Sequence, residues 1–444
     1  MASISYKVRE LGINAAVRYL EKDPDKNFPK LMDWVDRFAG GTFEPQGKAF
    51  RKFLIDEPDS NWAQLTKRVF TDLDRDILIT AFRNFFLNSS LIGGKKQQET
   101  REKYGCNVPF AILLDPTSAC NLKCTGCWAA EYGHTLNLTY DEIDSIITQG
   151  KEIGVYFYIY TGGEPLVRKK DIIRLCEKHQ DCTFLSFTNG TLIDEAFAED
   201  MLRVKNFIPA ISLEGFEEAT DARRGVGVYK RATDAMKILK AHHLLFGISA
   251  CYTSANMDSI TSEAFYDSLI EAGAYFVWYF HYMPVGKDAV PSLLPTPEQR
   301  EYIYHKIREY RKTKAIFGMD FQNDGEFVGG CIAGGRRYLH INANGDMDPC
   351  VFIHYSDSNI REKTLLEGLT SPLFMAYHDG QPFNKNHLRP CPMLENPELL
   401  RAMVKKTQAH STDMEAPEGV DELCDRCVSY ADNWKGKADE LWNR

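Results

Sequence analysis

Hydrophobic and polar positions change their spacing near residue 106. Before it, apolar residues recur every three or four positions, which is the period of an amphipathic helix. The helical segments are Val8–Leu20, Phe28–Phe38, Trp62–Phe70 and Ile77–Leu87. Asp23-Pro24-Asp25 and the polar stretch 56–61 separate them in the manner of helix breaks with caps. We therefore expect a helical N-terminal region over residues 1–105.

From about Phe110, short β-rich runs alternate with helical stretches. The predicted strands are Phe110–Leu114, Val155–Tyr160, Thr183–Phe187, Ile208–Leu213, Phe246–Tyr252 and Tyr275–Tyr282. The predicted helices between them are Tyr140–Ile153, Lys170–Lys178, Glu195–Val204, Tyr229–His243 and Met257–Ala272. This alternation favours a parallel sheet of βα units. Six units are too few to close an eight-stranded barrel, so we expect an α/β fold with a partial (β/α)6 TIM-like barrel over residues 106–318.

The pattern changes again in residues 319–444, which follow a predicted helix over Arg300–Tyr310. Arg337–Ile353 reads as a hairpin, and its Asn344-Gly345 pair is typical of a type I′ turn. The last fifty residues are polar and irregular until a predicted helix at Ala431–Trp442. We expect a small cysteine-rich C-terminal domain here.

Composition bounds the class of protein. Of 444 residues, 44% are hydrophobic and 26% are charged, which is ordinary for a soluble globular enzyme. A net charge of −9 argues against a nucleic-acid partner. Met1–Lys7 lacks the apolar stretch of a signal peptide, and the longest apolar runs, Val155–Tyr160 and Ala274–Phe280, are too short for a transmembrane segment. We expect a cytoplasmic protein with reduced thiols.

Three cysteines in one loop carry the strongest chemical signal. Cys120, Cys124 and Cys127 are spaced C-x3-C-x2-C directly after the first predicted strand, where functional loops leave a parallel sheet. A cubane iron–sulfur cluster takes four ligands, so three local thiolates leave one iron open for an outside ligand. Zinc or a redox dithiol is the alternative, but the C-x2-C pairs 124/127 and 424/427 lie almost three hundred residues apart.

The remaining nine cysteines divide into two groups. Four lie in apolar or helical settings and are expected to be buried structural thiols: Cys106, Cys176, Cys182 and Cys251. Five follow residue 330, and four of these can hold a second cluster with complete protein ligation. Cys331, Cys350 and Cys427 are three of the predicted ligands. The fourth is either Cys391 or Cys424, and the prolines beside Cys391 favour that residue.

In their order along the chain, several motifs resemble those of the radical S-adenosylmethionine (SAM) enzymes. They are Cys120-x3-Cys124-x2-Cys127, Thr161-Gly162-Gly163-Glu164-Pro165, Thr188-Asn189-Gly190, Ser212-Leu213-Glu214-Gly215 with Arg224-Gly225, and Met283–Gly286. The C-terminal spacing Cys331-x13-Gly345-x4-Cys350 resembles the SPASM or Twitch extension of that family. Further cysteines of a complete SPASM tail are missing, so one auxiliary cluster is expected rather than two.

The resemblance implies the cofactors and their contacts. It implies a SAM-binding 4Fe-4S cluster on Cys120, Cys124 and Cys127, SAM itself, and one auxiliary 4Fe-4S cluster. It also implies the SAM contacts: Gly162 and Gly163 through backbone oxygens, Glu164 and Pro165 by fixing the turn, Thr188, Asn189 and Ser212 toward ribose, and Arg224 toward the carboxylate. Two positions depart from the family. Gly126 stands where an aromatic residue is frequent, so Trp128 either packs beside adenine or belongs to the core. Glu214 replaces the usual aspartate.

The resemblance further implies a radical SAM oxidoreductase. Its reduced cluster cleaves SAM to a 5′-deoxyadenosyl radical, which abstracts hydrogen from a peptide, small-metabolite or lipid substrate. The auxiliary cluster takes an electron or positions substrate. An electron donor such as flavodoxin or ferredoxin is the expected partner. No catalytic side chain is identified, although His281 is a candidate base. The alternative is a non-catalytic iron–sulfur electron-transfer or zinc-binding protein.

Overall fold

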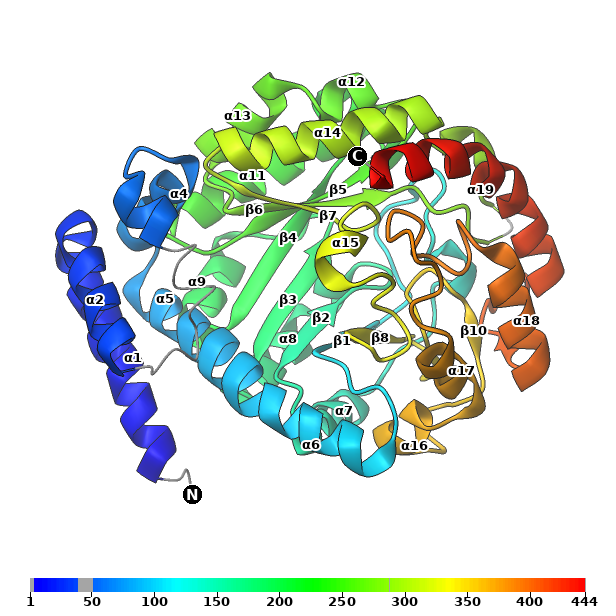
Figure 1. Ribbon diagram of the computed structural model, residues 1–444, viewed down its shortest axis with the longest axis horizontal. Helices are drawn as coiled ribbons and strands as arrows, with labels where there is room; N and C mark the ends of the chain where they lie inside the picture. The colour runs from blue at the N-terminus through cyan, green and yellow to red at the C-terminus, as the bar shows by residue number, and fades with distance from the viewer. Residues whose placement is uncertain (1–3, 39–50, 287, 444) are drawn as a thin grey trace.

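The computed structural model describes residues 4–38, 51–286 and 288–443. The predicted N-terminal helices are confirmed, and a π-helix (η2) follows α5. The elements are α1 (Ile4–Lys22), α2 (Pro24–Phe38), η1 (Lys52–Asp56), α4 (Asn61–Asp72), α5 (Arg75–Phe82), η2 (Arg83–Gly93) and α6 (Gly94–Tyr104). Ser60 caps α4 by accepting a hydrogen bond from the Ala63 amide. These helices lie along one side of the sheet (Figure 1).

The centre of the molecule is one nine-stranded sheet in the order β7-β6-β5-β4-β3-β2-β1-β8-β9. All neighbours are parallel except β8 and β9, which are antiparallel. The strands are β1 (Ala111–Leu114), β2 (Phe157–Tyr160), β3 (Thr183–Thr188), β4 (Phe207–Leu213), β5 (Gly247–Tyr252), β6 (Phe276–His281), β7 (Phe317–Asp320), β8 (Tyr338–Ile341) and β9 (Met347–Asp348). The six predicted strands and the partial TIM-like barrel are confirmed, and two further parallel strands extend the sheet.

Helices cover the outer face of the curved sheet (Figure 1). They are α7 (Tyr140–Glu152), α8 (Lys169–Lys178), α9 (Glu195–Val204), α10 (Glu217–Arg224), α11 (Val228–Ala241), α12 (Met257–Ile260), α13 (Glu263–Ala272) and α14 (Pro297–Thr313). The single helix predicted over Met257–Ala272 is two helices, because Ser262 caps a new one by accepting a hydrogen bond from the Phe265 amide. Helix α14 packs against β7, the short strand that the sequence pattern does not reveal.

The C-terminal chain returns to the barrel before it forms its own elements. These are α15 (Gly325–Val328), β10 (Tyr355–Ser356), α16 (Leu365–Leu369), α17 (Pro372–Gly380), α18 (Pro397–Thr407), β11 (His410–Ser411) and α19 (Val420–Trp442). Strand β8 pairs with β1 in the barrel sheet, so residues assigned to the C-terminal domain complete the sheet of the preceding one. The domain division at residues 318 and 319 remains a prediction.

Two local expectations in this region are corrected. The predicted hairpin forms, but its turn is not type I′: Gly345 has a φ of +88°, whereas Asn344 does not have a positive φ. The Gly345 amide donates to the Asn342 carbonyl, which gives a wider loop. Helix α19 begins eleven residues before the predicted helix, because Leu423, Cys427 and Trp434 continue its buried stripe. Across the described ranges, no helix is both long enough and apolar enough to span a bilayer.

Candidate functional site

The three loop cysteines share one wall of a cavity of about 520 Å³ inside the barrel. Their loop follows β1 and is held at both ends: Thr117 bridges to Asn137, and the Thr125 amide donates to the Arg223 carbonyl. Burial raises the pKa of the Cys120 thiol to about 11, and nearby Glu164, Cys124 and Cys127 add to the rise. The thiols are thus close enough to disfavour each other's ionisation, which is the situation that a bound cationic cluster relieves.

The arrangement of the thiols bears on the zinc alternative. Within residues 4–38, 51–286 and 288–443, no group of three or more His, Cys, Asp or Glu side chains is arranged to hold a metal ion. A tetrahedral zinc site with Zn–S bonds of about 2.3 Å draws its sulfurs close together. In a cubane cluster each thiolate binds a different iron, so the sulfurs stand farther apart. The argument for a cluster over zinc remains the sequence one, that three thiolates stand in one loop without a fourth cysteine nearby.

The Gly162–Glu164 segment lies directly against the cysteine loop. The Gly163 amide donates to the Thr117 carbonyl and the Glu164 amide to the Ala119 carbonyl. A Cβ at position 163 would stand 2.3 Å from the Ala119 carbonyl oxygen, so only glycine permits this approach. The segment belongs to the same cavity wall as the cysteines.

Glu164 is a buried connector between β2 and β3. Its carboxylate accepts hydrogen bonds from the Thr188 hydroxyl at 2.7 Å, the Asn189 amide at 2.8 Å and the Leu166 amide at 2.9 Å. Burial raises the pKa of Glu164 despite these donors. Thr188 is committed to Glu164, and the Asn189 side-chain amide donates to Asn121 of the cysteine loop.

Seven of the eight predicted SAM contacts lie on the cavity wall: Gly162, Gly163, Glu164, Thr188, Asn189, Ser212 and Arg224. Pro165 does not line the cavity and instead opens a 3-10 helix, η4 (Pro165–Arg168). The roles of these residues toward SAM remain predictions.

Glu214 forms ion pairs with two arginines of the cavity wall. One of its oxygens lies 2.8 Å from Arg223 and 2.6 Å from Arg224, and the other oxygen has no hydrogen-bond partner. Burial lowers the pKa of each guanidinium, but the surrounding anionic groups raise the pKa by a larger amount, so both arginines stay charged. Two arginines and one glutamate leave one net positive charge beside Cys124, which suits a carboxylate ligand.

We expect Arg224→Met to raise the dissociation constant for SAM about tenfold to a hundredfold, because a charged, bidentate contact is lost while Glu214 keeps Arg223 as its partner. Equilibrium binding of SAM to the cluster-loaded protein measures the change. Arg231→Met, at an exposed position on α11, is the control and should bind SAM as the wild type does. Equal SAM affinities in the wild type and both variants would show that Arg224 does not contact SAM.

Tyr282 fills the space beside Gly126. Gly126 has a φ of +62°, and a Cβ there would lie 2.6 Å from the Tyr282 hydroxyl oxygen. An aromatic side chain at position 126 is thus excluded, and an aromatic from the end of β6 stands in its place. Trp128 lines the cavity too, with its ring edge-on to Tyr132 and Phe352.

Two sequence interpretations change around the cavity. Cys106, Cys176 and Cys182 are buried as expected, but Cys251 is a cavity-lining thiol beside Arg223. His281 also reaches the wall, but one ring nitrogen lies 2.5 Å from the Tyr282 carbonyl and the other 2.6 Å from the Tyr430 hydroxyl. Burial lowers the pKa of His281 well below its usual range. Both nitrogens are engaged, so the structure does not favour His281 as a base.

The sequence profile of the radical SAM superfamily matches residues 114–251, which hold the cysteine loop and the strand ends described above. This segment of the chain is a radical SAM domain. As a radical SAM protein the chain is an enzyme, and the non-catalytic alternative is not supported. Two of the expected cofactors are also confirmed, a SAM-binding 4Fe-4S cluster and SAM, whereas the auxiliary cluster remains a prediction.

Curated relatives match more than half of this chain. An AdoMet-dependent heme synthase of Methanosarcina barkeri is 25% identical over 291 residues, or 59% of this chain and 82% of the relative. A PqqA peptide cyclase of Granulibacter bethesdensis is 25% identical over 258 residues, or 54% of this chain and 67% of the relative. The structure of Streptococcus suis SuiB bound to S-adenosylmethionine shares the fold, with a TM-score of 0.55, 18% identity and coverage of 79% of this chain and 84% of that one.

In this radical SAM enzyme, the five C-terminal cysteines lie in one apolar cluster. Burial raises the pKa of Cys331 to about 12 and that of Cys350 to about 11, and the Cys350 sulfur lies 2.7 Å from the Tyr338 hydroxyl. Burial also raises the pKa of Cys391, and Glu395, Cys331 and Cys350 raise it further.

The two cysteines of α19 differ in their surroundings. Burial raises the pKa of Cys427 to about 12, and Cys424 raises it further. The pKa of Cys424 is influenced by Arg401 and Glu398 of α18. The pKa of Cys391, unlike that of Cys424, is raised by both Cys331 and Cys350, which favours Cys391 as their partner. The full ligand set Cys331, Cys350, Cys391 and Cys427 remains a prediction.

A buried charge network that the sequence did not reveal joins the ends of β1, β8 and β9. His340 on β8 lies 2.9 Å from Asp115, which follows β1, and 3.2 Å from Asp348 on β9. All three side chains are fully buried. The sequence did hold one sign of this network: a histidine stands within the apolar run Tyr-Leu-His-Ile, and a buried polar group needs a partner.

The His340 network predicts a pH-dependent stability. Burial lowers the pKa of His340, but Asp115 and Asp348 raise it by more, to about 9. In the unfolded chain it is about 6.5. The charged form therefore stabilises the fold fully below about pH 6.5, and this contribution is lost as the pH rises through 9. Urea unfolding should show that the advantage of the wild type over His340→Gln shrinks between about pH 7 and pH 10. A difference in unfolding free energy between the two proteins that stays constant with pH would contradict a charged His340 paired with Asp115 and Asp348.

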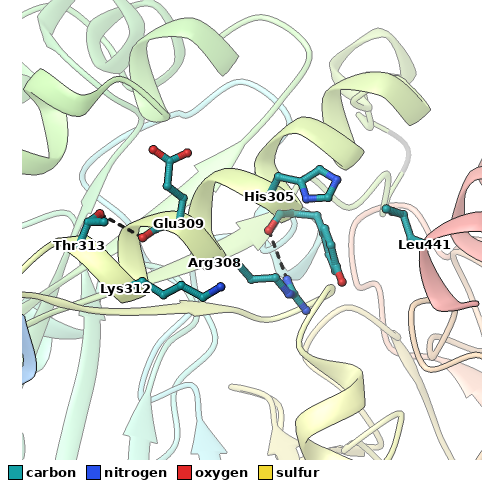
Figure 2. Close-up of a pocket in the computed structure, with 7 residues that line it drawn as sticks. His305, Arg308, Glu309, Lys312, Thr313 and Leu441 are labelled. Atoms are coloured by element: carbon teal, nitrogen blue, oxygen red, sulfur yellow. Dashed lines mark hydrogen bonds between the residues drawn. The ribbon is translucent and has the colours of Figure 1, made fainter. Parts of the chain in front are cut away.

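A second hollow, of about 410 Å³, lies on the outer surface and shares no residue with the cysteine cavity. Figure 2 shows it along α14, lined by Tyr304, His305, Arg308, Glu309, Lys312, Thr313 and, from α19, Leu441. Thr313 and Arg308 donate to carbonyls of their own helix. It is a groove beside one helix and has no part in the cysteine site.

Proposed function

We propose that this enzyme removes a hydrogen atom from an unactivated carbon of a substrate held inside the barrel. The observation that carries the proposal is a single cavity that joins the cysteine loop, the polar strand ends and the aromatic interior of the barrel. When bound, the 4Fe-4S cluster and SAM supply a 5′-deoxyadenosyl radical. Peptides, small metabolites and lipids are the candidate substrates.

Each residue has a task in this scheme. Cys120, Cys124 and Cys127 hold the cluster, and the net positive charge of the Glu214 group orients the SAM carboxylate. The backbone oxygens of Gly162 and Gly163 receive the SAM ammonium. Glu164 fixes their turn by its three buried hydrogen bonds. The aromatic wall excludes water from the reacting carbon, which is a main contribution of the protein when a cofactor supplies the chemistry.

We assign the auxiliary 4Fe-4S cluster to Cys331, Cys350, Cys391 and Cys427. When bound, this cluster supplies either an electron acceptor or a contact to substrate. Tyr338 supports a contact between this cluster and substrate, because Tyr338 lines the cavity and its hydroxyl contacts the Cys350 sulfur. The electron donor is a flavodoxin or a ferredoxin.

Spectroscopy of the anaerobically reconstituted protein tests the proposed function. Adding SAM should change the EPR spectrum of the reduced enzyme, because SAM binds the open iron of the loop cluster. The comparison requires a sample fully loaded with iron. Identical spectra with and without SAM would overturn the proposal.

A further inference from the structure

The inner face of the barrel is mostly apolar. Alternate residues of several strands line the cavity, as the alternation of side chains in a strand requires. From β6 and β7 these are Phe276, Trp278, Phe280, Phe317 and Met319, and Phe321 follows directly after β7. From Phe276 to Tyr282, the residue after β6, the chain covers six residue steps, or about 20 Å. The cavity is therefore elongated and extends from the cysteine end of the barrel to the opposite end.

These inward side chains are less buried than their outward neighbours. Along β6, residues facing the cavity are half-buried, whereas Val277 and Tyr279, under the outer helices, are fully buried. In a closed eight-stranded barrel the inward side chains fill the interior. Here they surround an open space. A wall of aromatic rings facing water is unfavourable, so the space is suited to an apolar occupant.

The charged side chains of the wall lie at the two ends of this cavity, with Ser249 as a small polar residue between them. At the cysteine end lie the SAM contacts described above. At the opposite end Phe85 and Phe317 are 39% and 41% exposed, which shows that the cavity reaches solvent there. The one cation of the wall at this end is Arg337, an exposed residue immediately before β8.

The guanidinium of Arg337 is available to a ligand. Among the described residues it has no carboxylate partner, and the neighbouring Arg101 and Arg336 donate to backbone carbonyls. Each of these two arginines has its pKa lowered by burial and then by the charge of Arg337, which places all three close together. A cationic group at the mouth of an apolar channel matches an amphiphile with an anionic head.

We propose that the substrate is a lipid whose anionic head lies beside Arg337 and whose apolar chain extends along the barrel toward the cysteine loop. This inference rests on the proposed function and names its substrate class. It also places the reacting carbon far from the head, at the cluster end of the cavity. A peptide is disfavoured because its backbone groups would find few partners between Phe276 and Phe321. A tetrapyrrole with several carboxylates is disfavoured because Arg223 and Arg224 are assigned to Glu214 and the SAM carboxylate, which leaves Arg337 as the arginine of the described lining that can meet a substrate carboxylate.

Binding of a stearate spin-labelled near its methyl end tests the inference, with the EPR signal of the immobilised label as the readout. The protein is the cluster-loaded, oxidised full chain. We expect saturable binding that is weakened at least about tenfold by Arg337→Glu, which repels the head. Ser249→Trp, from the inner face of β5, should weaken it similarly by filling the channel. Arg231→Glu is the surface control and should bind as the wild type does.

The outcomes separate this inference from the proposed function. No saturable binding, or binding that neither Arg337→Glu nor Ser249→Trp weakens, overturns the lipid assignment, whatever the enzyme does with SAM. Iron content confirms that each variant is folded. Lipid binding with this variant pattern supports the assignment even if SAM leaves the EPR spectrum of the reduced enzyme unchanged, in which case only the proposed function fails.

Discussion

Replacing Cys124 by alanine is expected to abolish SAM cleavage. Cys124 lies on the cavity wall, and burial raises the pKa of its thiol although the charge of Arg224 lowers it. Without it, two thiolates remain for a cluster that needs three from this loop. Losing a residue that only supports a metal ligand lowers activity by up to about a hundredfold. Cys124 is itself a ligand, so we expect 5′-deoxyadenosine formation to fall by more than that. Chromatography of 5′-deoxyadenosine after incubation with SAM and dithionite measures the loss.

Cys176→Ala is the matched control for that substitution. Cys176 is fully buried on α8 and does not line the cavity. Losing its sulfur costs about 1 kcal/mol of stability, and SAM cleavage should continue at the rate of the wild type. A Cys124→Ala protein that still cleaves SAM would refute the assignment of the loop triplet, since the remaining cysteines would then be sufficient.

Replacing Cys350 by alanine is expected to remove the auxiliary cluster. Iron content should fall from about eight to about four atoms per chain, because each cubane holds four irons. Substrate turnover should be lost, while cleavage of SAM without product persists at least in part, since the loop cysteines are untouched. Iron analysis together with quantification of 5′-deoxyadenosine and product checks this. Unchanged iron content would show that Cys350 is not a ligand.

The same analysis decides the fourth ligand. Cys391→Ala should lose iron as Cys350→Ala does, whereas Cys424→Ala should keep it, because Cys391 is the residue whose pKa responds to both Cys331 and Cys350. Both variants remove one thiol from the same apolar cluster, so each controls for the packing loss of the other. The reverse pattern would assign Cys424 in place of Cys391.

Local patterns were sufficient to predict the barrel and the cysteine loop. Strands such as Phe246–Tyr252 alternate with amphipathic helices, and this fixes a parallel sheet whose loops gather at one edge. The motif residues Gly162 and Arg224 could be placed because they follow strands in the expected order. Residues that act through distant partners were not predictable in this way. Asp115 and His340 are 225 positions apart, and only the pairing of β1 with β8 brings them together.

The interior of the barrel was also beyond prediction. Trp278 and Phe280 look like strand core in the sequence, and alternation alone does not say whether the inward or the outward face is the filled one. The structure shows that the outward residues carry the packing and that the inward ones surround space. The N-terminal half of α19 was missed for a different reason: its first turns hold Asp421, Glu422 and two cysteines, a composition that is typical of a polar tail.

The pairing of β8 with β1 means that the catalytic barrel cannot be cut free of its C-terminal chain. A protein truncated before residue 338 would expose the backbone of β1 as an unpaired strand edge, directly below the cysteine loop. Such edges recruit strands from other molecules, and Asp115 would lose its buried counter-ion. Truncated barrels should therefore aggregate, and folding of the tail is a precondition for a stable radical SAM core.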